Sequence, residues 1–256
     1  MDRSSPDGRQ PGRFWRGTVA EDGVSVILPV FNDRPALERA IPESIAALSE
    51  ITDTFEVIVA EDGSTDGSAE FVQAWHERDS RVILLHADER LGRGRALNRA
   101  IESASQSIIC YYDVDLATDL THLPELVGAI RDGADIATGS RLMPESKTIR
   151  SGGREITSRG YNLLVRVFLG SKLFDHQCGF KAFRKERIHN LIPEIQATHW
   201  FWDTEVLVRG QRKGYRIAEF PVVWRQGPGT TVRCKDIFSM GSQILGLWWQ
   251  LHVEEG

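Results

Sequence analysis

The chain has 256 residues, 41% of them hydrophobic and 26% charged, so it can bury the core of one large α/β domain or two small ones. A net charge of −5 argues against nucleic acid as the main partner, and no apolar run approaches the roughly 20 residues that span a bilayer. Three cysteines without metal-like spacing, Cys110, Cys178 and Cys234, are expected to be unpaired thiols in a reducing compartment.

Apolar, strand-like runs alternate with helical patterns in the first half of the chain. Residues 1–22 are polar, lack the apolar core of a secretory signal, and are expected to form a disordered tail. The predicted elements that follow are strands at 24–30, 55–60, 81–86, 107–112 and 135–139, with helices at 35–48, 67–78, 94–104 and 120–132. Strands with little polar alternation, separated by helices, predict a parallel sheet whose carboxyl ends meet at one edge.

The second half is less regular. Residues 150–172 carry five basic residues and one acidic residue, and an apolar stripe falls at helical spacing: Ile156, Gly160, Leu163, Leu164 and Val167. Such a helix lies either in a membrane interface or on the sheet. A strand-like stretch at 217–224 precedes a glycine-rich loop, 226–231, and the apolar segment 237–251 carries Trp248 and Trp249, which suit an interface or a dimer contact.

Two acidic clusters each follow a predicted strand. Asp113 and Asp115 come directly after 107–112, and as i and i+2 residues of an extended segment they share a face. Mg²⁺ favours one or two protein carboxylates together with substrate phosphates, which this sparse pair would supply. The second cluster, 61–66, follows 55–60. The plain alternatives are a solvated acidic turn for the pair and a β-turn with helix capping for 61–66.

Three motifs in chain order resemble those of the family 2 glycosyltransferases, which bind a nucleotide-diphospho-sugar on a Rossmann-like sheet. The motifs are Pro29-Val30-Phe31-Asn32-Asp33, Glu61-Asp62-Gly63-Ser64-Thr65-Asp66-Gly67 and Asp113-Val114-Asp115. Phe31, Asp33 and Glu61 replace the family's tyrosine, glutamate and first aspartate. The resemblance implies a base and ribose pocket lined by Pro29, Phe31, Asp33, Glu61 and Asp62. It also implies that Asp113 and Asp115 hold Mg²⁺ or Mn²⁺ against the diphosphate.

Gly92-Arg93-Gly94 looks like the family's Gly-Lys-Gly loop, which opens a helix. Glycines let a backbone approach a ligand closely, and a helix amino terminus favours phosphate. Arg93 is therefore expected to contact the nucleotide.

Further motifs resemble those of polyprenyl-phosphate hexosyltransferases, the dolichyl-phosphate glucose and dolichyl-phosphate mannose synthases. They are Gly139-Ser140-Arg141, Ser158-Arg159-Gly160, Asp175-x-Gln177-Cys178-Gly179-Phe180-Lys181 and Trp202-Asp203-Thr204-Glu205. The last two look closer to the glucosyl branch, and the resemblance runs from about residue 24 to 232. In the loop after Arg225, Thr231 stands where the family has a lysine, and Arg233 could take over that lysine's role. Separately, Ala117 stands where relatives have glutamine.

A lipid phosphate acceptor arrives already anionic, so it needs positioning and charge neutralisation rather than a base. Arginine suits that task, and the candidates are Arg141, Arg159 and Arg225, each with a surface ion pair as the plain alternative. Asp203 and Glu205 either have a direct catalytic role, or instead order the active-site loops or help hold the metal. Their spacing at an expected helix start also fits amino-terminal capping.

The sequence predicts a single α/β domain at 23–256 with a mainly parallel, Rossmann-like sheet and an amphipathic helical carboxyl-terminal portion. The predicted function is metal-dependent, inverting transfer of glucose or mannose from UDP-glucose or GDP-mannose to a polyprenyl or dolichyl phosphate. Its catalytic residues would be Asp113, Asp115, Arg159, Arg225 and Asp203. The expected location is peripheral, at the cytoplasmic face of the membrane. Attachment would be direct or through a membrane partner protein, and a homodimer is a further candidate. The alternatives are transfer to a sugar hydroxyl with Asp203 or Glu205 as base, and a non-catalytic nucleotide-sugar-binding module.

Overall fold

The structure is a computed structural model that describes residues 22–149, 152–225 and 234–254, with residues 152–154, 234–240 and Glu254 described as backbone only. The tail predicted for 1–22 and the glycine-rich loop, with Thr231 and Arg233, lie almost wholly outside the described residues. Cys110 and Cys178 are free, buried thiols.

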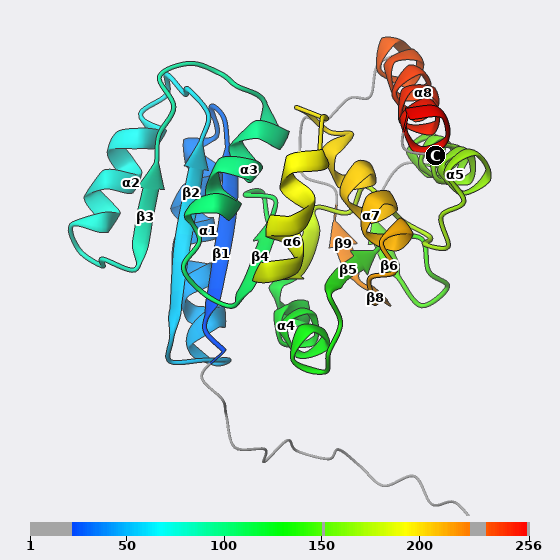
Figure 1. Cartoon of the computed structure of the whole chain (residues 1–256). Coiled ribbons are helices and arrows are strands. Elements are labelled where there is room, and N and C mark those ends of the chain that lie inside the picture. The colour runs from blue at the N-terminus through cyan, green and yellow to red at the C-terminus, as the bar shows by residue number, and fades with distance from the viewer. Residues whose placement is uncertain (1–21, 150–151, 226–233, 255–256) are drawn as a thin grey trace, which may run out of the picture.

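The nine described strands alternate with helices over most of the chain (Figure 1). The strands are β1 (Val24–Val30), β2 (Phe55–Glu61), β3 (Val82–Leu85), β4 (Ile108–Tyr112), β5 (Ile136–Ser140), β6 (Lys147–Ile149), β7 (Phe180–Arg184), β8 (Ile217–Pro221) and β9 (Val223–Arg225). The helices are α1 (Arg34–Ser49), α2 (Ser68–His76), α3 (Arg93–Ser103), α4 (Leu123–Arg131), α5 (Gly152–Leu169), α6 (Lys185–Leu191), α7 (Trp202–Arg212) and α8 (Cys234–Trp249). Short helical turns are η1 (Leu120–His122), η2 (Ile192–Glu194) and η3 (Gln250–Glu254).

Seven strands form the central sheet in the order β3-β2-β1-β4-β7-β5-β8. All neighbours pair in parallel except β7, which runs antiparallel between β4 and β5. The predicted, mainly parallel sheet is confirmed, and β7 is a strand that was not predicted from the sequence. β6 and β9 form a separate parallel pair, and a bridge between Thr118 and Trp224 joins β9 to the chain after β4.

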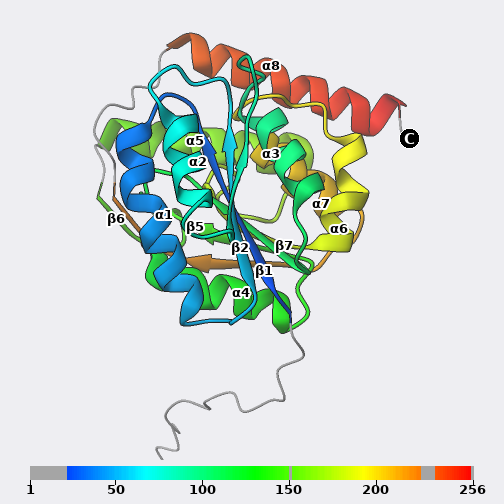
Figure 2. The ribbon, with the colours of Figure 1, turned by 90° about the vertical axis from the view of Figure 1, so that its left-hand side faces the viewer.

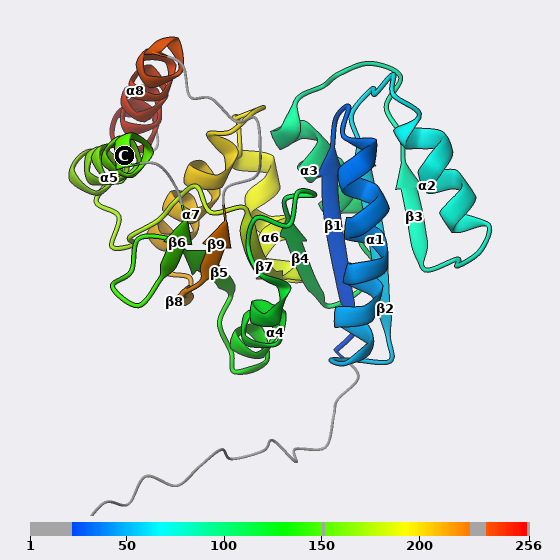
Figure 3. The same ribbon diagram turned by 180° about the vertical axis from the view of Figure 1, so that it is seen from behind.

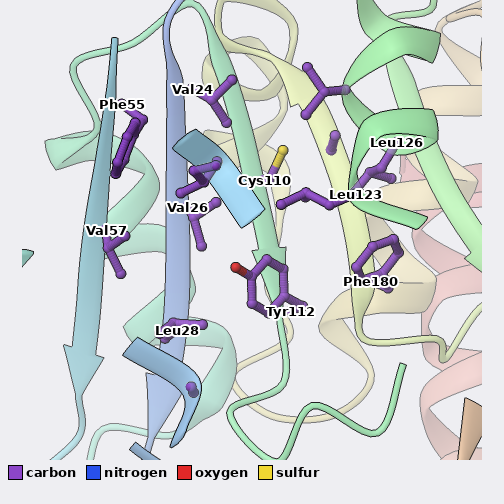
Figure 4. Packing of buried hydrophobic residues seen from close by; sticks show 14 of the residues in the cluster. Val24, Val26, Leu28, Phe55, Val57, Cys110, Tyr112, Leu123, Leu126 and Phe180 are labelled. Atoms are coloured by element: carbon purple, nitrogen blue, oxygen red, sulfur yellow. The ribbon is translucent and has the colours of Figure 1, made fainter. Parts of the chain in front are cut away.

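Helices cover both faces of the sheet, as Figure 2 shows with α1, α2 and α4 on one side and α3, α6 and α7 on the other. Because side chains alternate along a strand, Val26, Val57 and Cys110 pack toward α1 and α4 (Figure 4). On the other face of the sheet, Ile27, Ile58 and Ile109 pack toward α3 and α7. A third cluster joins α5, α7 and α8 through Tyr161, Val165, Leu169, Phe201, Val208, Ile244, Leu247 and Leu251.

Two predicted elements are divided in the structure. The helix expected at 120–132 begins as η1 and continues as α4, which has a proline in its first turn, where a missing N–H costs little. The strand expected at 217–224 is split between β8 and β9, which belong to different sheets. This split carries β9 from the central sheet to the loop that follows β4.

Candidate active site

The paired aspartates lie where β4 ends at the carboxyl edge of the parallel strands. The Asp113 N–H donates to the Gly179 carbonyl at 3.1 Å, next to the start of β7. Its carboxylate packs so closely on this glycine that a Cβ at position 179 would lie 2.0 Å from Oδ2 of Asp113. Gly179 is therefore the residue that makes room for the first acid, whose side chain remains 36% exposed.

Asp115 lies two residues further on, within electrostatic range of Asp113. Leu116 adopts φ +51°, and Asp115 Oδ1 accepts a hydrogen bond from the Ala117 N–H at 3.0 Å. Burial, with the negative charges of Asp113 and Asp33, raises the pKa of Asp115, while Arg39 opposes the shift. Crowding of carboxylates at an edge open to solvent is the electrostatic condition that a bound cation relieves.

These residues fit a divalent metal of the hard, oxygen-seeking type. Within the described ranges no cluster of three or more His, Cys, Asp or Glu side chains could cage an ion. Two carboxylates alone are the protein share typical of Mg²⁺ or Mn²⁺ sites that are completed by substrate phosphates and water.

Arg93 lies between two acids at the start of α3. Its Nη2 donates to Asp113 Oδ1 at 2.7 Å and its Nη1 to Asp203 Oδ2 at 2.6 Å. The guanidinium also lies 5.3 Å from the Tyr111 ring and 4.9 Å from the Trp200 ring, while its Nε is buried without a hydrogen-bond partner. Burial alone lowers the pKa of Arg93, but the two carboxylates outweigh it and raise the pKa, so the group is a permanent cation. The prediction that Arg93 contacts the nucleotide stays a prediction.

The glycines around Arg93 are required by the chain itself. Gly92 has φ +102°, and a Cβ there would lie 2.6 Å from the Thr198 carbonyl oxygen. A Cβ on Gly94 would lie 2.6 Å from the carbonyl oxygen of Ala197. The Gly94 N–H donates to the Thr198 carbonyl at 2.8 Å, so the start of α3 is pressed against the loop before α7.

Asp203 is enclosed by hydrogen-bond donors in the first turn of α7. Besides Arg93, it accepts from the Tyr111 hydroxyl and, at 2.8 Å, from Lys181 Nζ. Burial raises the pKa of Asp203 to about 6, although Arg93 opposes the shift. Burial likewise lowers the pKa of Lys181 to about 8. Each oxygen of Asp203 is engaged and the side chain is almost fully buried, which favours the loop-ordering interpretation of this residue.

Lys181 was not singled out as a site residue from the sequence. It lies in the middle of β7, fully buried, and its Nζ also donates to the Cys178 carbonyl at 2.5 Å. A lysine between Phe180 and Ala182 in an apolar strand is the signal that could have found it, because a buried cation needs a carboxylate partner. Glu205, by contrast, accepts from the Ala197 N–H at 2.8 Å and pairs with Arg209 at 2.8 Å, so it shapes the loop before α7.

The residues predicted for the nucleotide pocket meet at the ends of β1 and β2. Pro29 is paired in register with Ala60 in the sheet, and Asp33 caps α1 by accepting from the Ala36 N–H at 3.3 Å. The Phe31 ring lies 4.0 Å from the Arg90 guanidinium.

The two acids of the second cluster are engaged with nearby chain. Glu61 is fully buried and accepts from the Ser64 N–H and contacts His86. The two oxygens of Asp62 accept from the Leu91 and Gly92 N–H groups at 2.8 and 3.0 Å. Asp62 therefore ties the acidic turn to the loop that carries Arg93.

The three candidate phosphate-binding arginines have different surroundings. Arg141 is held by Asp175 through two bonds, of 2.7 and 2.8 Å, in a buried ion pair and not the surface pair expected as the alternative. Burial alone raises the pKa of Asp175, but Arg141 outweighs it and holds the pKa well below its usual range. Arg159 is exposed on α5 and pairs with Glu155 at 2.8 Å.

Arg225 ends β9 beside the loop that carries Asp115. Its N–H donates to the Ala117 carbonyl at 2.8 Å, and its side chain is exposed. The Arg141 guanidinium also lies near this region, 5.7 Å from the ring of Trp224 and within electrostatic range of Asp113. Arg159 instead lines a cavity of about 200 Å³ that also involves Leu142, Arg166 and Phe174.

The mainly parallel sheet, with helices on both faces and the acidic pair after β4, is a doubly wound α/β fold of the kind that binds ligands at the carboxyl ends of its strands. The family model described as Glycosyl transferase family 2 matches residues 25–192, and the chain belongs to this family. The resemblance to polyprenyl-phosphate hexosyltransferases is likewise confirmed.

Among curated relatives, glycosyltransferase AglD of Haloferax volcanii is 48% identical over 97% of this chain, and this chain spans only 40% of that relative's length. A dolichyl-phosphate beta-glucosyltransferase of Dictyostelium discoideum is 28% identical over 88% of this chain and 76% of its own.

Among solved structures, glucosyl-3-phosphoglycerate synthase of Mycobacterium tuberculosis with Mn²⁺, UDP and glucosyl-3-phosphoglycerate has a TM-score of 0.63. It is 22% identical and covers 90% of this chain and 80% of its own. The mannosyltransferase PcManGT of Pyrobaculum calidifontis with GDP-Man and Mn²⁺ has a TM-score of 0.61 at 22% identity, over 91% of this chain and 64% of its own. These likenesses support the fold.

Proposed function

We propose that this glycosyltransferase moves a hexose, with inversion, from a nucleotide-diphosphate sugar to a polyprenyl or dolichyl phosphate at the cytoplasmic face of a membrane. The observation that supports a phosphate acceptor is the enclosure of the Asp203 carboxylate by hydrogen-bond donors. Its carboxylate oxygens are taken by Arg93, Lys181 and Tyr111, so it is poorly placed to remove a proton from an alcohol. A phosphate acceptor is already ionised and needs no such base.

Asp113 and Asp115 would hold Mg²⁺ or Mn²⁺, which would supply positive charge to stabilise the leaving diphosphate. Arg93 holds the Asp113 carboxylate by a hydrogen bond, and Gly179, which has no side chain, leaves room for that carboxylate. Arg225, at the loop of Asp115, and Arg159 would position the acceptor phosphate, while Arg141 would act through its pair with Asp175.

Pro29, Phe31 and Asp33 would form the base and ribose pocket, with Glu61 and Asp62 fixing its walls. Glucose is the proposed sugar, because several relatives bear the name dolichyl-phosphate beta-glucosyltransferase.

One observation favours a second candidate, transfer to a sugar hydroxyl. Burial raises the pKa of Asp203 to about 6, within the range that suits a general base near neutral pH. The two candidates differ in the acceptor that they require.

Transfer is tested with purified protein, radiolabelled UDP-glucose or GDP-mannose, and polyprenyl phosphate, by following label into organic solvent with Mg²⁺ or Mn²⁺ present. Asp115→Asn is expected to lower the rate at least about a hundredfold, because the leaving group loses its charge stabilisation. Asp132→Asn is the matched control, since Asp132 is exposed where α4 ends, next to the start of β5 and not at the edge that carries the acidic pair. A near wild-type rate for Asp115→Asn contradicts the proposed mechanism.

A further inference from the structure

Most of the exposed large hydrophobic side chains among the described residues gather on α5 and on the carboxyl-terminal α8 and η3. The described residues include twelve of them, of which five lie on α5, three on α8 and one on η3. They are Ile156, Leu163, Leu164, Val167, Phe168, Leu245, Trp248, Trp249 and Val253. None lies on α1, α2, α3 or α4. A contiguous apolar surface of this kind marks an interaction site, whereas scattered single residues do not.

The two helices are neighbours, packed on each other and on α7 through Tyr161, Val165 and Ile244. Figures 1 and 3 show them side by side at the end of the molecule opposite to α2 and β3. The stripe that the sequence predicted on α5 is therefore not the face that docks on the protein. Ile156 is 75% exposed and Val167 is 68% exposed, while the opposite side of α5 is buried.

Basic side chains accompany this apolar surface. Arg159 and Arg166 are exposed on α5, and exposed Lys172 follows the helix. The acid among the described side chains of α5 is Glu155, which pairs with Arg159. A second copy of the chain would bring like charges together across such a face, whereas anionic lipid headgroups complement them. Tryptophans such as Trp248 and Trp249 also suit the boundary between water and lipid.

The same helix also lines a cavity. Arg159, Leu163 and Arg166 line the cavity of about 200 Å³ together with Leu142, which follows Arg141 directly in the chain. The apolar face and this cavity thus share α5.

We propose that the exposed side of α5 and α8, defined by the nine hydrophobic residues above, lies in the headgroup region of an anionic bilayer. This deepens the proposed function and rests on it for its purpose, because a polyprenyl phosphate resides in such a bilayer. Both helices would lie along the surface with their apolar side chains inserted. In the described part of the chain, no helix is long and apolar enough to cross a membrane.

The test is flotation of the protein with vesicles of phosphatidylcholine mixed with phosphatidylglycerol, without any nucleotide sugar. The variant Ile156→Glu/Val167→Glu removes two highly exposed side chains from the face, so its fold is expected to be unchanged. Its control, Ala46→Glu/Gln73→Glu, adds negative charge at exposed positions on α1 and α2. Wild type and control are expected to float, and the variant to bind at least about tenfold more weakly. Vesicles of phosphatidylcholine alone are expected to bind the wild type less, and Arg166→Gln is expected to reduce that lipid preference.

Wild-type protein that stays unbound, or a variant that floats as well as the control, overturns the proposal. A wild-type dimer in light scattering that becomes monomeric in Ile156→Glu/Val167→Glu also overturns it, in favour of a second copy as the occupant. Transfer to a short, water-soluble polyprenyl phosphate separates this proposal from the proposed function. The variant should retain that activity, whereas a wild type that floats but transfers nothing contradicts the proposed function alone.

Discussion

The substitution Gly179→Ala tests how the first acid of the proposed metal site is held. A Cβ at this position would lie 2.0 Å from Asp113 Oδ2 and 2.5 Å from its Cγ. Ordinary van der Waals contact begins near 3.4 Å, so the carboxylate must retreat by about 1.4 Å or the chain must shift. Because Asp113 also bonds to Arg93 at 2.7 Å, retreat disturbs that pair as well.

A misplacement of about 1 Å in a reacting constellation costs on the order of a hundredfold in rate, and we expect Gly179→Ala to lose at least that much. The assay is label transfer to polyprenyl phosphate over a range of Mn²⁺ concentrations, in which the variant should also need more metal for half-maximal rate. Thermal unfolding should show that the variant still folds.

The control is Gly128→Ala in α4, where an added Cβ meets nothing within 4 Å. This change should leave the rate unaltered and stabilise the helix by about 0.5–1 kcal/mol. A rate for Gly179→Ala within about twofold of the wild type, in place of the hundredfold loss expected from a displaced carboxylate, would refute the reasoning about Asp113.

Three further predictions concern the buried charges, acid stability and the metal. Asp203→Asn leaves Lys181 without its carboxylate partner, so it should lower the free energy of unfolding by about 3–5 kcal/mol and impair activity. If activity is lost while stability in urea is unchanged, the base role of Asp203 is supported instead. Burial lowers the pKa of His176 to about 4 from its ordinary 6.5, so this group binds protons more readily in the unfolded chain. The contribution of neutral His176 to the free energy of unfolding is full above pH 6.5 and is lost as the pH falls toward 4, about 3 kcal/mol in all. His176→Gln should therefore flatten the pH dependence of the free energy of unfolding between pH 6.5 and 4. An equal slope in both proteins contradicts this assignment. A chelator should abolish transfer, and added Mg²⁺ or Mn²⁺ should restore it; activity that persists in the chelator argues against a metal at the site.

Local pattern was enough to predict the parallel half of the sheet. β2 is apolar from Val57 to Ala60 and ends at Glu61, and the apolar β4 is followed directly by Asp113. These properties are visible without tertiary contacts. Asp113 and Glu61 lie at the same edge of the sheet because β2, β1 and β4 are parallel, as the alternation of strands and helices predicts.

The antiparallel strand and the buried charge network could not be predicted in this way. β7 contains Lys181 at a fully buried position, and its sequence neighbours show that it needs a carboxylate partner but not which one. Its ammonium is stabilised by Asp203, and Asp203 by Arg93, which lies 110 residues away in the chain. Only the fold brings these residues together, and the same holds for Arg141 and its partner Asp175.

The direction in which α5 faces was left open by its sequence, since an apolar stripe fits either a sheet or a lipid surface. The structure packs Tyr161 and Val165 inward and leaves Ile156 and Val167 outward, a choice set by α7 and α8 rather than by α5 itself.

The comparison of polyprenyl phosphate with the matching polyprenol tests the central claim most directly, because the two acceptors differ only in the ionised group. The purified enzyme, supplied with labelled nucleotide sugar and a divalent metal, is predicted to glycosylate the phosphate and to leave the alcohol unmodified. Transfer to the polyprenol at a comparable rate, or to a sugar hydroxyl but not to the lipid phosphate, would contradict the account.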